Sequence, residues 1–600
     1  MSTTIRERSE IAEKDRWALE DLYPAVQDWE KDLEKLNALI ESLPSYRGKI
    51  SASADLLLAY LRLNDEISVL FDSVANYAQR KTDEDTRISE NQALSARVMT
   101  AYVKAGELSD FEAPEILSIS DEALEGFYAQ QPALRLYERY LTKLRLRRAH
   151  ILDAAGEKLL ASAGDMAQTP ENVFSLFSDA DMTFPDVEDA EGKKHPLSQG
   201  SYITLMMSPD RILRKNAFEA YYSVYQSFRN TLAATLSGNV KSLWFFTKAR
   251  NYASPLERAL DGTEVPVSVY HSLISSVRKN LPLMERYVAL RKKLMGLDEL
   301  HFYDLYAPLL PAADREIPYE ETVETVCEAL LPLGEDYVQM LRKGFASRWV
   351  DVYENRGKRS GAYSAGARVH PYVLLNYTGN LDGQFTVAHE MGHALHSYYS
   401  NTTQPVVYSD YVIFVAEVAS TCNEALLMES LLAKTTDKKE RAYLLNHFLE
   451  QFRATLFRQT MFAEFELKIA DLEAQGVPLT EETLCREYRE LVHDYFGDGV
   501  VLDEQIALEW ARIPHFYYNF YVYQYATGYA AAIALSRKIL REGKSAAEAY
   551  RSFLCGGCST DPISLLRGAG VDMTSGEPVQ AAMELFSELL DEMETLCGEL

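Results

Sequence analysis

The sequence predicts a mainly α-helical fold. Through most of the 600 residues, apolar side chains recur three and four positions apart, a spacing that places them on one face of a helix. Residues 55–79, DLLLAYLRLNDEISVLFDSVANYAQ, and residues 210–236 are two examples. The hydrophobic content of 47% is enough for a large core. Two segments interrupt this helical pattern, the first rich in turn residues and the second in glycines.

The first interruption is MTFPDVEDAEGKKHPLSQG, residues 182–200. Turn residues between two short β-prone runs predict a β-hairpin there. We therefore expect the chain to divide into an N-terminal helical domain, residues 1–200, and a second domain, residues 201–600, which contains the candidate catalytic motif described below.

The second interruption is residues 358–383, where glycines flank the β-rich run VHPYVLLNY at 369–377. A strand here with an open edge could pair with an extended peptide. A buried strand with both edges paired fits the same residues equally well.

Charge and hydropathy exclude several partners. The formal net charge is −28 and no tract rich in Lys or Arg occurs, so we expect neither nucleic acid nor an anionic membrane as a partner. The N-terminus, MSTTIRERSEIAEKDRW, has no apolar core of a signal peptide. No apolar run approaches the roughly 20 residues that span a bilayer. These features predict a cytoplasmic protein.

The six cysteines are too sparse for a disulfide framework and fit a reducing compartment. Only Cys555-Gly-Gly-Cys558 has the spacing of a metal or redox site. A zinc ribbon would need a second pair, and a thioredoxin-like site would need a βαβ setting. We therefore predict no redox role for this pair.

The stretch TVAHEMGHALHSYY, residues 386–399, contains H-E-x-x-H. On a helix that begins at Asn380 or Asp382, His389 and His393 lie one turn apart on one face, so both imidazoles can reach one metal ion. Glu390 is offset around the helix, where it can act on a water at the metal without becoming a ligand. This is the arrangement that a metallopeptidase needs.

A catalytic zinc takes three protein ligands and keeps one position open, so a third ligand is required. His396 is too far along the helix, because seven residues span about 10.5 Å. The H-x-x-G-x-x-H arrangement that returns a third histidine is absent as well. We therefore expect His396 to be a packing or supporting residue.

Glu417 and Glu424 are better candidates, in the helical stretch 412–434. Carboxylates among apolar neighbours are costly unless they are paired or bind an ion. Seven residues place both on one helix face, so one can bind the metal while the other accepts a hydrogen bond from a ligand histidine. The alternative is that both point to solvent.

Several stretches together resemble oligoendopeptidase F, of the thimet oligopeptidase superfamily of zinc metallopeptidases. They cover nearly the whole chain: WALEDLYP (17–24), F-P-x-V (184–187), FYDLYAPL (302–309), DVYENRGKRSGAYS (351–364), HPYVLLNY (370–377), FVAEVASTCNE (414–424), IPHFYYNFYVYQYATG (513–528) and GVDMTS (570–575).

The resemblance implies one zinc ion per chain and a glutamate about 25 residues after the second histidine as the third ligand. Glu417 follows His393 by 24 residues. It also implies two helical parts that enclose a deep substrate channel, with a small β element beside the zinc-binding helix. Where the family commonly has a Gly-Gly turn between small residues, this chain has Cys555 and Cys558 around the glycines.

Tyrosines are dense in residues 511–535, and Tyr518, Tyr521 and Tyr525 would share one helix face three residues after His515. Such a stripe often belongs to the core. The resemblance implies that a histidine and tyrosines of a late helix bind the scissile carbonyl oxygen. On that basis we assign His515, Tyr518 and Tyr525, with Tyr521 in reserve.

The expected function is zinc-dependent hydrolysis of internal bonds in short, unstructured oligopeptides, with Glu390 as general base. A dipeptidyl carboxypeptidase-type exopeptidase is an alternative, and it would need a cation such as Arg359 or Arg368 for the substrate carboxylate. A catalytically silent peptide-binding protein is a second alternative, against which the intact Glu390 argues. The sequence leaves the oligomeric state and the residue preference open.

Overall fold

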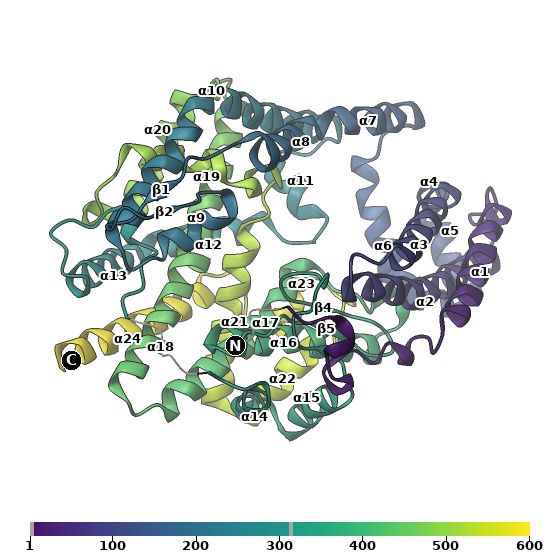
Figure 1. The fold of residues 1–600 in the computed structure, drawn as a ribbon. Helices are drawn as coiled ribbons and strands as arrows, with labels where there is room; N and C mark the ends of the chain where they lie inside the picture. The colour runs from purple at the N-terminus through teal and green to yellow at the C-terminus, as the bar shows by residue number, and fades with distance from the viewer. Residues whose placement is uncertain (1–4, 311–315, 600) are drawn as a thin grey trace. The chain divides into compact units, whose positions relative to one another are not determined.

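The computed structural model describes residues 5–310 and 316–599 and is mainly α-helical, as predicted (Figure 1). The chain packs into two compact units, each built from three segments. The first unit comprises Met1–Ala149, Arg315–Leu427 and Leu535–Gly570, and the second comprises His150–Asp314, Met428–Ala534 and Val571–Leu600. The predicted division into 1–200 and 201–600 does not coincide with these units, because the chain passes between them repeatedly. As a division into functional domains it stays a prediction.

The residues of α17 and α21 are divided between the two units, and thirteen of the described α-helices lie wholly or partly in the first unit. They are α1 (Val26–Ser42), α2 (Ala54–Glu84), α3 (Ser89–Leu108), α4 (Glu112–Ser118), α5 (Asp121–Gln130), α6 (Glu138–Leu146), α14 (Tyr319–Ala329), α15 (Glu335–Ala346), α16 (Leu381–Thr403), α17 (Ile413–Lys434), α21 (Tyr523–Glu542), α22 (Lys544–Leu554) and α23 (Pro562–Gly568).

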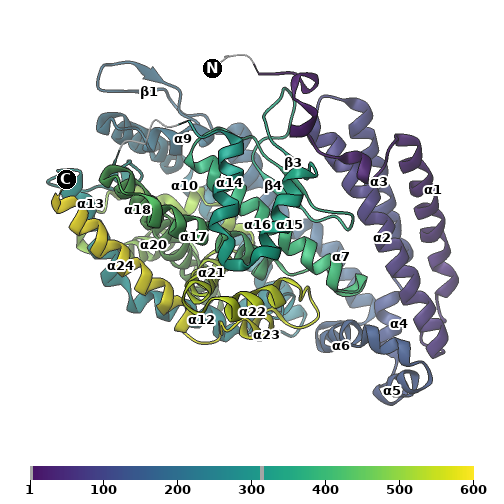
Figure 2. The same ribbon diagram turned by 90° about the horizontal axis from the view of Figure 1, so that it is seen from below.

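The N-terminal helices α1, α2 and α3 lie side by side (Figure 1, Figure 2). α2 begins where the Ser53 side chain accepts a hydrogen bond from the backbone N–H of Leu56, as an N-cap serine does. The predicted apolar stripe of α2, including Leu57, Leu61 and Val74, is buried in the core of this group.

A three-stranded sheet packs beside α16, with strands β3 (Val350–Asp351), β5 (Tyr372–Leu374) and β4 (Tyr363–Ala365) in that order. β5 pairs in parallel with β3 and antiparallel with β4. The run VHPYVLLNY therefore supplies the buried middle strand, and the open-edge interpretation of that run is wrong. β4, from the same glycine-rich segment, is the half-buried outer strand of the sheet.

The predicted hairpin of residues 182–200 is present in the second unit, as β1 (Val187–Glu188) paired antiparallel with β2 (Lys194–His195). The helices of this unit are α7 (Ala154–Ala167), α8 (Thr169–Leu176), α9 (Gln199–Met206), α10 (Arg211–Ala249), α11 (Pro255–Asp261), α12 (Val267–Lys279), α13 (Leu281–Leu294), α18 (Lys438–Gln451), α19 (Arg458–Ala474), α20 (Glu481–Phe496) and α24 (Glu577–Glu599). α24 packs against α13 and α18 (Figure 2).

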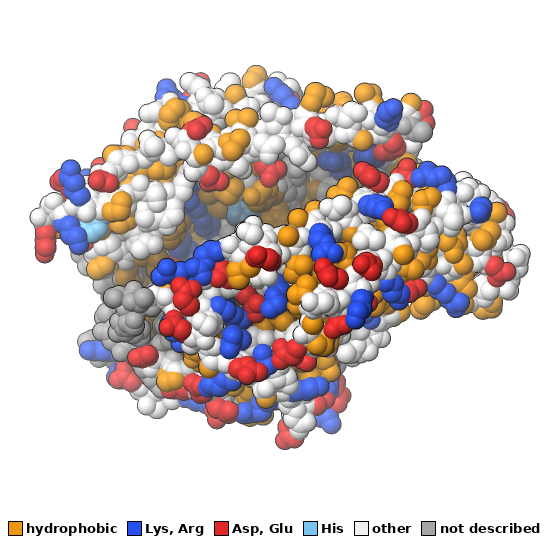
Figure 3. Space-filling model, turned by 45° about the vertical axis from the view of Figure 1, so that its right-hand side comes forward, with side chains coloured by type: hydrophobic (Ala, Val, Ile, Leu, Met, Phe, Trp, Pro, Cys, Tyr) orange, Lys and Arg blue, Asp and Glu red, His pale blue; other side chains and the backbone are white. Residues whose placement is uncertain are grey.

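The surface carries both charge signs. Acidic and basic side chains are interspersed on the face drawn in Figure 3. Among the helices of the described residues, none is both long and apolar enough to cross a membrane. The cytoplasmic location stays a prediction.

Helices α16 and α17 approach closely in the first unit, and a glycine permits it. A Cβ at Gly392 would lie 2.7 Å from the Ser420 Cα and 2.8 Å from the Ala419 carbonyl oxygen. The buried Asn423 of α17 adds a bridge, because its Nδ2 donates to the Ala388 carbonyl oxygen of α16 at 3.1 Å. Gly392 therefore sets how near these two helices can lie.

We predict that Gly392→Ala destabilises the protein by about 1–3 kcal/mol, the usual cost of overpacking, because backbone atoms of α17 cannot move aside as a side chain can. The free energy of unfolding in urea measures this. The control is Gly126→Ala in α5, where no atom lies within 4 Å of the added Cβ, so the better helix former should stabilise by up to about 1 kcal/mol. Equal effects of the two substitutions would contradict the steric argument.

Candidate functional site

The structure brings His389, His393 and Glu417 together. One potential ligand atom from each lies within 4.8 Å of the other two, and no other such group of three occurs in the described ranges 5–310 and 316–599. The Glu417 Oε2 is 3.5 Å from the His389 Nε2 and 3.7 Å from the His393 Nε2. α16 supplies both histidines one turn apart, and α17 supplies the carboxylate.

This donor set fits a catalytic zinc ion. Two imidazoles and one carboxylate are a known catalytic combination that leaves one position open. With bonds of about 2.0–2.2 Å, the ligand atoms around a tetrahedral ion lie about 3.4 Å apart. The measured separations between the glutamate oxygen and the two histidine nitrogens are close to that value.

Two of the candidate ligands are held by a further side chain. The His389 Nδ1 hydrogen-bonds to the Glu424 Oε1. The hydroxyl of Ser420 donates to the Glu417 Oε2 at 3.2 Å. These partners orient the His389 ring and the Glu417 carboxylate. The geometry therefore fits the division of roles expected for Glu417 and Glu424.

The two histidines differ in proton affinity. Burial alone would lower the pKa of His389, but its hydrogen bond to Glu424 raises that pKa to about 9. Burial lowers the pKa of His393 to about 3. Because only a neutral imidazole can bind a metal, metal uptake at neutral pH would release a proton from His389.

Glu390 lies beside the candidate ligands without joining them. It is 7% exposed, and its Oε2 has no hydrogen-bond partner among the described residues. Burial raises its pKa to about 7. A buried carboxylate oxygen without a partner is rare in proteins, and one whose pKa is near neutral is suited to accept and return a proton.

His396 is not part of the metal group. It is buried, and its ring stacks on Tyr411 with 3.7 Å between centroids. Its position on α16 therefore fits the packing role expected from its distance along the helix.

The aromatic segment departs from the predicted helix. Pro514–Tyr517 forms a 3₁₀ turn and α21 begins only at Tyr523, so His515, Tyr518 and Tyr521 lie outside the α-helix. The break occurs at Asn519 and Phe520, which have φ of 52° and 62°. This left-handed conformation ends a right-handed helix and is unfavourable for a bulky residue.

The rings nevertheless gather around His515. Its centroid is 5.5 Å from that of Tyr518, 6.4 Å from Tyr521 and 6.0 Å from Tyr525. Tyr518 is 46% exposed, so it is no core residue. Burial lowers the pKa of His515. These residues belong to the second unit, and their action at the metal group stays a prediction.

Sequence reasoning missed Glu466 of α19. It is 4% exposed, and its Oε1 accepts a 2.9 Å hydrogen bond from the backbone N–H of Phe520, one of the two left-handed residues. Its Oε2 has no partner within the described part of the chain. The sequence offered little signal, because Glu466 lies between Glu464 and Lys468 in FAEFELKIA, and only its burial in α19 distinguishes it.

The Cys555-Gly-Gly-Cys558 segment is a tight turn. A Cβ at Gly557, where φ is +51°, would lie 2.0 Å from the Tyr408 carbonyl oxygen. The structure forms no disulfide between Cys555 and Cys558, and burial raises the pKa of Cys555. The close approach at Gly557 shows why the turn needs glycine, and the absence of a redox role stays a prediction.

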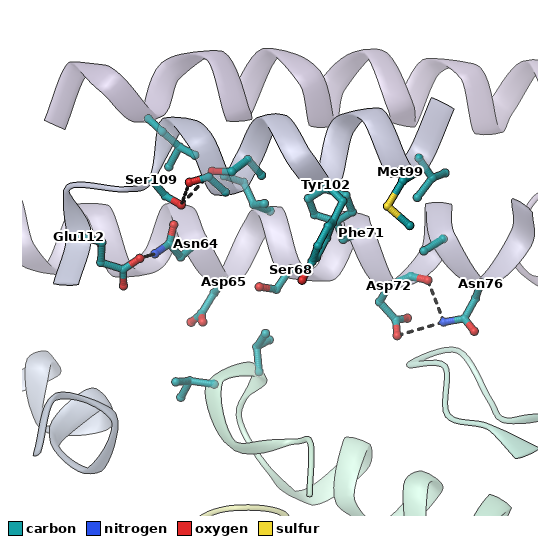
Figure 4. Close-up of a pocket in the computed structure, with 18 of the residues that line it drawn as sticks. Asn64, Asp65, Ser68, Phe71, Asp72, Asn76, Met99, Tyr102, Ser109 and Glu112 are labelled. Atoms are coloured by element: carbon teal, nitrogen blue, oxygen red, sulfur yellow. Dashed lines mark hydrogen bonds between the residues drawn. The ribbon is translucent and has the colours of Figure 1, made fainter. Parts of the chain in front are cut away.

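A large cavity of ≈ 1020 Å³ lies elsewhere in the first unit, along α2 and α3. Figure 4 shows Asp65, Ser68 and Asp72 projecting from one side of α2, while Phe71 and Tyr102 lie together near α3. None of the predicted site residues lines this cavity. This cavity and the candidate metal group are therefore different places in the fold.

The families that this chain matches are consistent with a metal-dependent peptidase site. A family model described as Peptidase family M3 matches residues 204–585, and one described as Oligopeptidase F matches residues 115–184. The first match alone covers more than half of the chain. The chain therefore belongs to peptidase family M3 and is a metallopeptidase.

Individual relatives narrow this class. The chain is 47% identical to oligopeptidase PepF of Bacillus subtilis, over 99% of this chain and 88% of the relative. It is 40% identical to group B oligopeptidase PepB of Streptococcus agalactiae, over 99% and 98%. The crystal structure of oligoendopeptidase-F from Enterococcus faecium matches with a TM-score of 0.75 at 37% identity, over 96% and 99%. The resemblance to oligoendopeptidase F is confirmed.

The environment of Glu466 predicts a pH-dependent stability. Burial raises its pKa from 4.5 to about 8. Between these values the folded state keeps a proton that the unfolded state has lost, so stability falls as pH rises, by up to about 1.4 kcal/mol per pH unit. Glu466→Gln keeps the acceptor for Phe520 and has no charge to bury. Its advantage in free energy of unfolding should grow from about pH 5 to about pH 8.

Urea unfolding of both proteins across this range measures the difference. A third protein, Glu466→Leu, leaves the Phe520 N–H without its acceptor and should lose about 1–3 kcal/mol relative to Glu466→Gln at every pH. Identical pH profiles of the original protein and Glu466→Gln would contradict a protonated Glu466.

Proposed function

We propose that this metallopeptidase is a zinc-dependent oligoendopeptidase that hydrolyses internal bonds of short, unstructured peptides. The observation that carries the proposal is the group of His389, His393 and Glu417, with Glu390 buried beside it. The relatives named oligopeptidase and oligoendopeptidase support the substrate class.

The proposed reaction divides its tasks among residues of this chain. His389, His393 and Glu417 would hold one zinc ion, which when bound supplies Lewis acidity that activates water and polarises a carbonyl. Glu390 takes the proton of the attacking water and passes it to the leaving amine. Its pKa of about 7 allows both transfers near neutral pH. Glu424 keeps His389 in the tautomer that presents Nε2.

His515 and the tyrosines around it are the proposed donors to the developing oxyanion, a role in which hydrogen bonds act most strongly. The structure supports Tyr521 as a third candidate beside Tyr518 and Tyr525, because its ring lies 5.4 Å from that of Tyr525 and 6.4 Å from that of His515. Tyr521 is therefore a proposed donor together with Tyr518 and Tyr525.

Substrate alignment is proposed at the outer strand β4. Its partner β5 occupies only one of its two edges, and an extended peptide could pair with the other. Hydrogen bonds between β4 and the backbone of the peptide depend little on the peptide's side chains, so peptides of varied sequence could bind. A deep channel, which the resemblance implies, would limit substrates by size.

The exopeptidase alternative lacks a dedicated cation at the two predicted positions. Arg359 is 56% exposed and lies beside Asp83. Arg368 donates to the Ser409 hydroxyl at 2.9 Å. The silent-binder alternative offers no reason for the buried, near-neutral Glu390. Both observations favour the endopeptidase.

We predict that the protein binds about one zinc ion per chain and that Glu417→Ala removes most of it, because two histidines alone hold zinc weakly. Glu424→Ala should keep the site and weaken affinity by about 10–100-fold, as loss of an orienting partner does. Elemental analysis after dialysis at two free zinc concentrations separates the variants. If Glu417→Ala retains zinc and Glu424→Ala loses it, Glu424 is the metal ligand and Glu417 is the residue that orients His389.

We also predict that Glu390→Gln keeps its zinc and fold but loses at least about 10²-fold in turnover, the low end for a general base. The assay is a defined peptide mixture whose products are identified by mass, with and without a chelator. Fragments cut at internal bonds would indicate an endopeptidase. Dipeptides released one after another from the C-terminus would indicate an exopeptidase, and the absence of products would indicate a peptide-binding protein without activity. Normal turnover by zinc-loaded Glu390→Gln would refute the proposed base.

A further inference from the structure

Three arginines line a small cavity in the second unit. Arg453, Arg458 and Arg512 surround a space of ≈ 10 Å³ together with Glu509 and the rings of Tyr202 and Tyr306. Such a volume has room for about one water-sized particle. We call it the arginine cavity.

The carboxylates around the arginine cavity do not balance its positive charge. Arg458 and Arg512 share the single carboxylate of Glu509, each at 2.7 Å. Arg453 shares Glu450 with Arg291, also at 2.7 Å each. Four guanidinium groups therefore meet two carboxylates, and two positive charges remain uncompensated. This surplus stands out in a chain whose net charge is −28.

Burial makes that surplus costly. Arg453 is 3% exposed, and the side chains of Arg458 and Arg512 are each 13% exposed. Charges removed from water need a counter-charge and hydrogen bonds. Aromatic ring faces partly stabilise the positive charge, since the Arg453 guanidinium lies 5.0 Å from the Tyr306 ring centroid. A ring face, however, cannot accept the in-plane N–H bonds of a guanidinium.

Each of the three arginines also has one guanidinium nitrogen that takes part in no hydrogen bond with the described residues, although none of these nitrogens is a fully buried atom without a partner. Arg453 donates to Glu450 through Nε and Nη2, which leaves Nη1. Arg458 donates to Glu509 through Nη1 and Nη2, which leaves Nε. Arg512 donates through Nε to the Tyr222 hydroxyl and through Nη2 to Glu509, which leaves Nη1. All three side chains line the same cavity.

We propose that the arginine cavity binds a small inorganic monoanion, for which chloride is the natural probe. The uncompensated charge calls for an anion, and the nitrogens without acceptors supply its hydrogen bonds. The small volume favours a monatomic ion over sulfate or the carboxylate of a peptide. Binding here is independent of the peptidase chemistry proposed above.

The position of the arginine cavity gives the anion a structural consequence. Glu509 and Arg512 belong to the 3₁₀ helix Glu504–Arg512, which ends three residues before His515. An anion that neutralises Arg512 would stabilise this helix against Arg453 and Arg458. The anion should therefore stabilise the second unit without touching the metal group.

Bromide locates the site directly. Crystals of the intact protein grown without chloride and soaked in sodium bromide should show an anomalous peak among the guanidinium groups of Arg453, Arg458 and Arg512. Bromide peaks only elsewhere on the protein would overturn the proposal. This measurement needs no variant and no activity.

A solution experiment tests specificity. The thermal unfolding midpoint should rise by a few degrees with sodium chloride and level off, whereas sodium gluconate at equal ionic strength should leave it lower. Arg458→Met should lose the chloride-specific rise in unfolding midpoint, because the negative charge of Glu509 then neutralises the single remaining positive charge of Arg512. The matched control is Arg278→Met, whose guanidinium meets both Glu464 and Asp494 and needs no anion.

Arg278→Met should keep the chloride-specific rise. No chloride effect in the original protein, or an equal effect in Arg458→Met, would contradict the proposal. Should Arg458→Met fail to fold, the bromide experiment on the original protein decides.

Discussion

The close approach of α16 and α17 is the constraint on which the candidate site depends. Two ligand atoms come from one helix and the third from the other, so the group exists only while the helix axes stay near. Gly392 permits that distance, and Asn423 ties α17 both to α16 and, through the Tyr337 hydroxyl at 3.1 Å, to α15. A shift of 1 Å between the helices is about five times the tolerance of roughly 0.2 Å on a metal–ligand distance.

A second constraint, that buried charge needs compensation, acts differently at three places. Glu417 lies where two imidazoles and a cation can share its charge. Glu466 has no cation beside it in the described part of the chain, so its burial favours the protonated form. The arginine cavity has the opposite excess, and only an anion can balance it. The cost of removing charge from water thus predicts a metal at the half-buried Glu417, a proton on the buried Glu466 and an anion among the arginines.

Features determined by local sequence were predictable. Apolar spacing gave the helices α2 and α10, turn residues gave the hairpin β1–β2, and Asn380 does accept a hydrogen bond from the Gly383 N–H at the start of α16. The grouping of His389, His393 and Glu417 also follows from helix geometry once α17 packs on α16. Within one helix, spacing alone decides which side chains meet.

Features determined by distant partners were not predictable. Whether the strand at 372–374 has an open edge depends on β3, more than twenty residues upstream. The helix expected through Tyr518 and Tyr521 is interrupted at Phe520, whose N–H is held by Glu466, 54 residues earlier in the chain. Local spacing favours a helix there, but one buried carboxylate offers the backbone a different partner. The rings still gather around His515, because a turn can bring side chains as close as one helical face does.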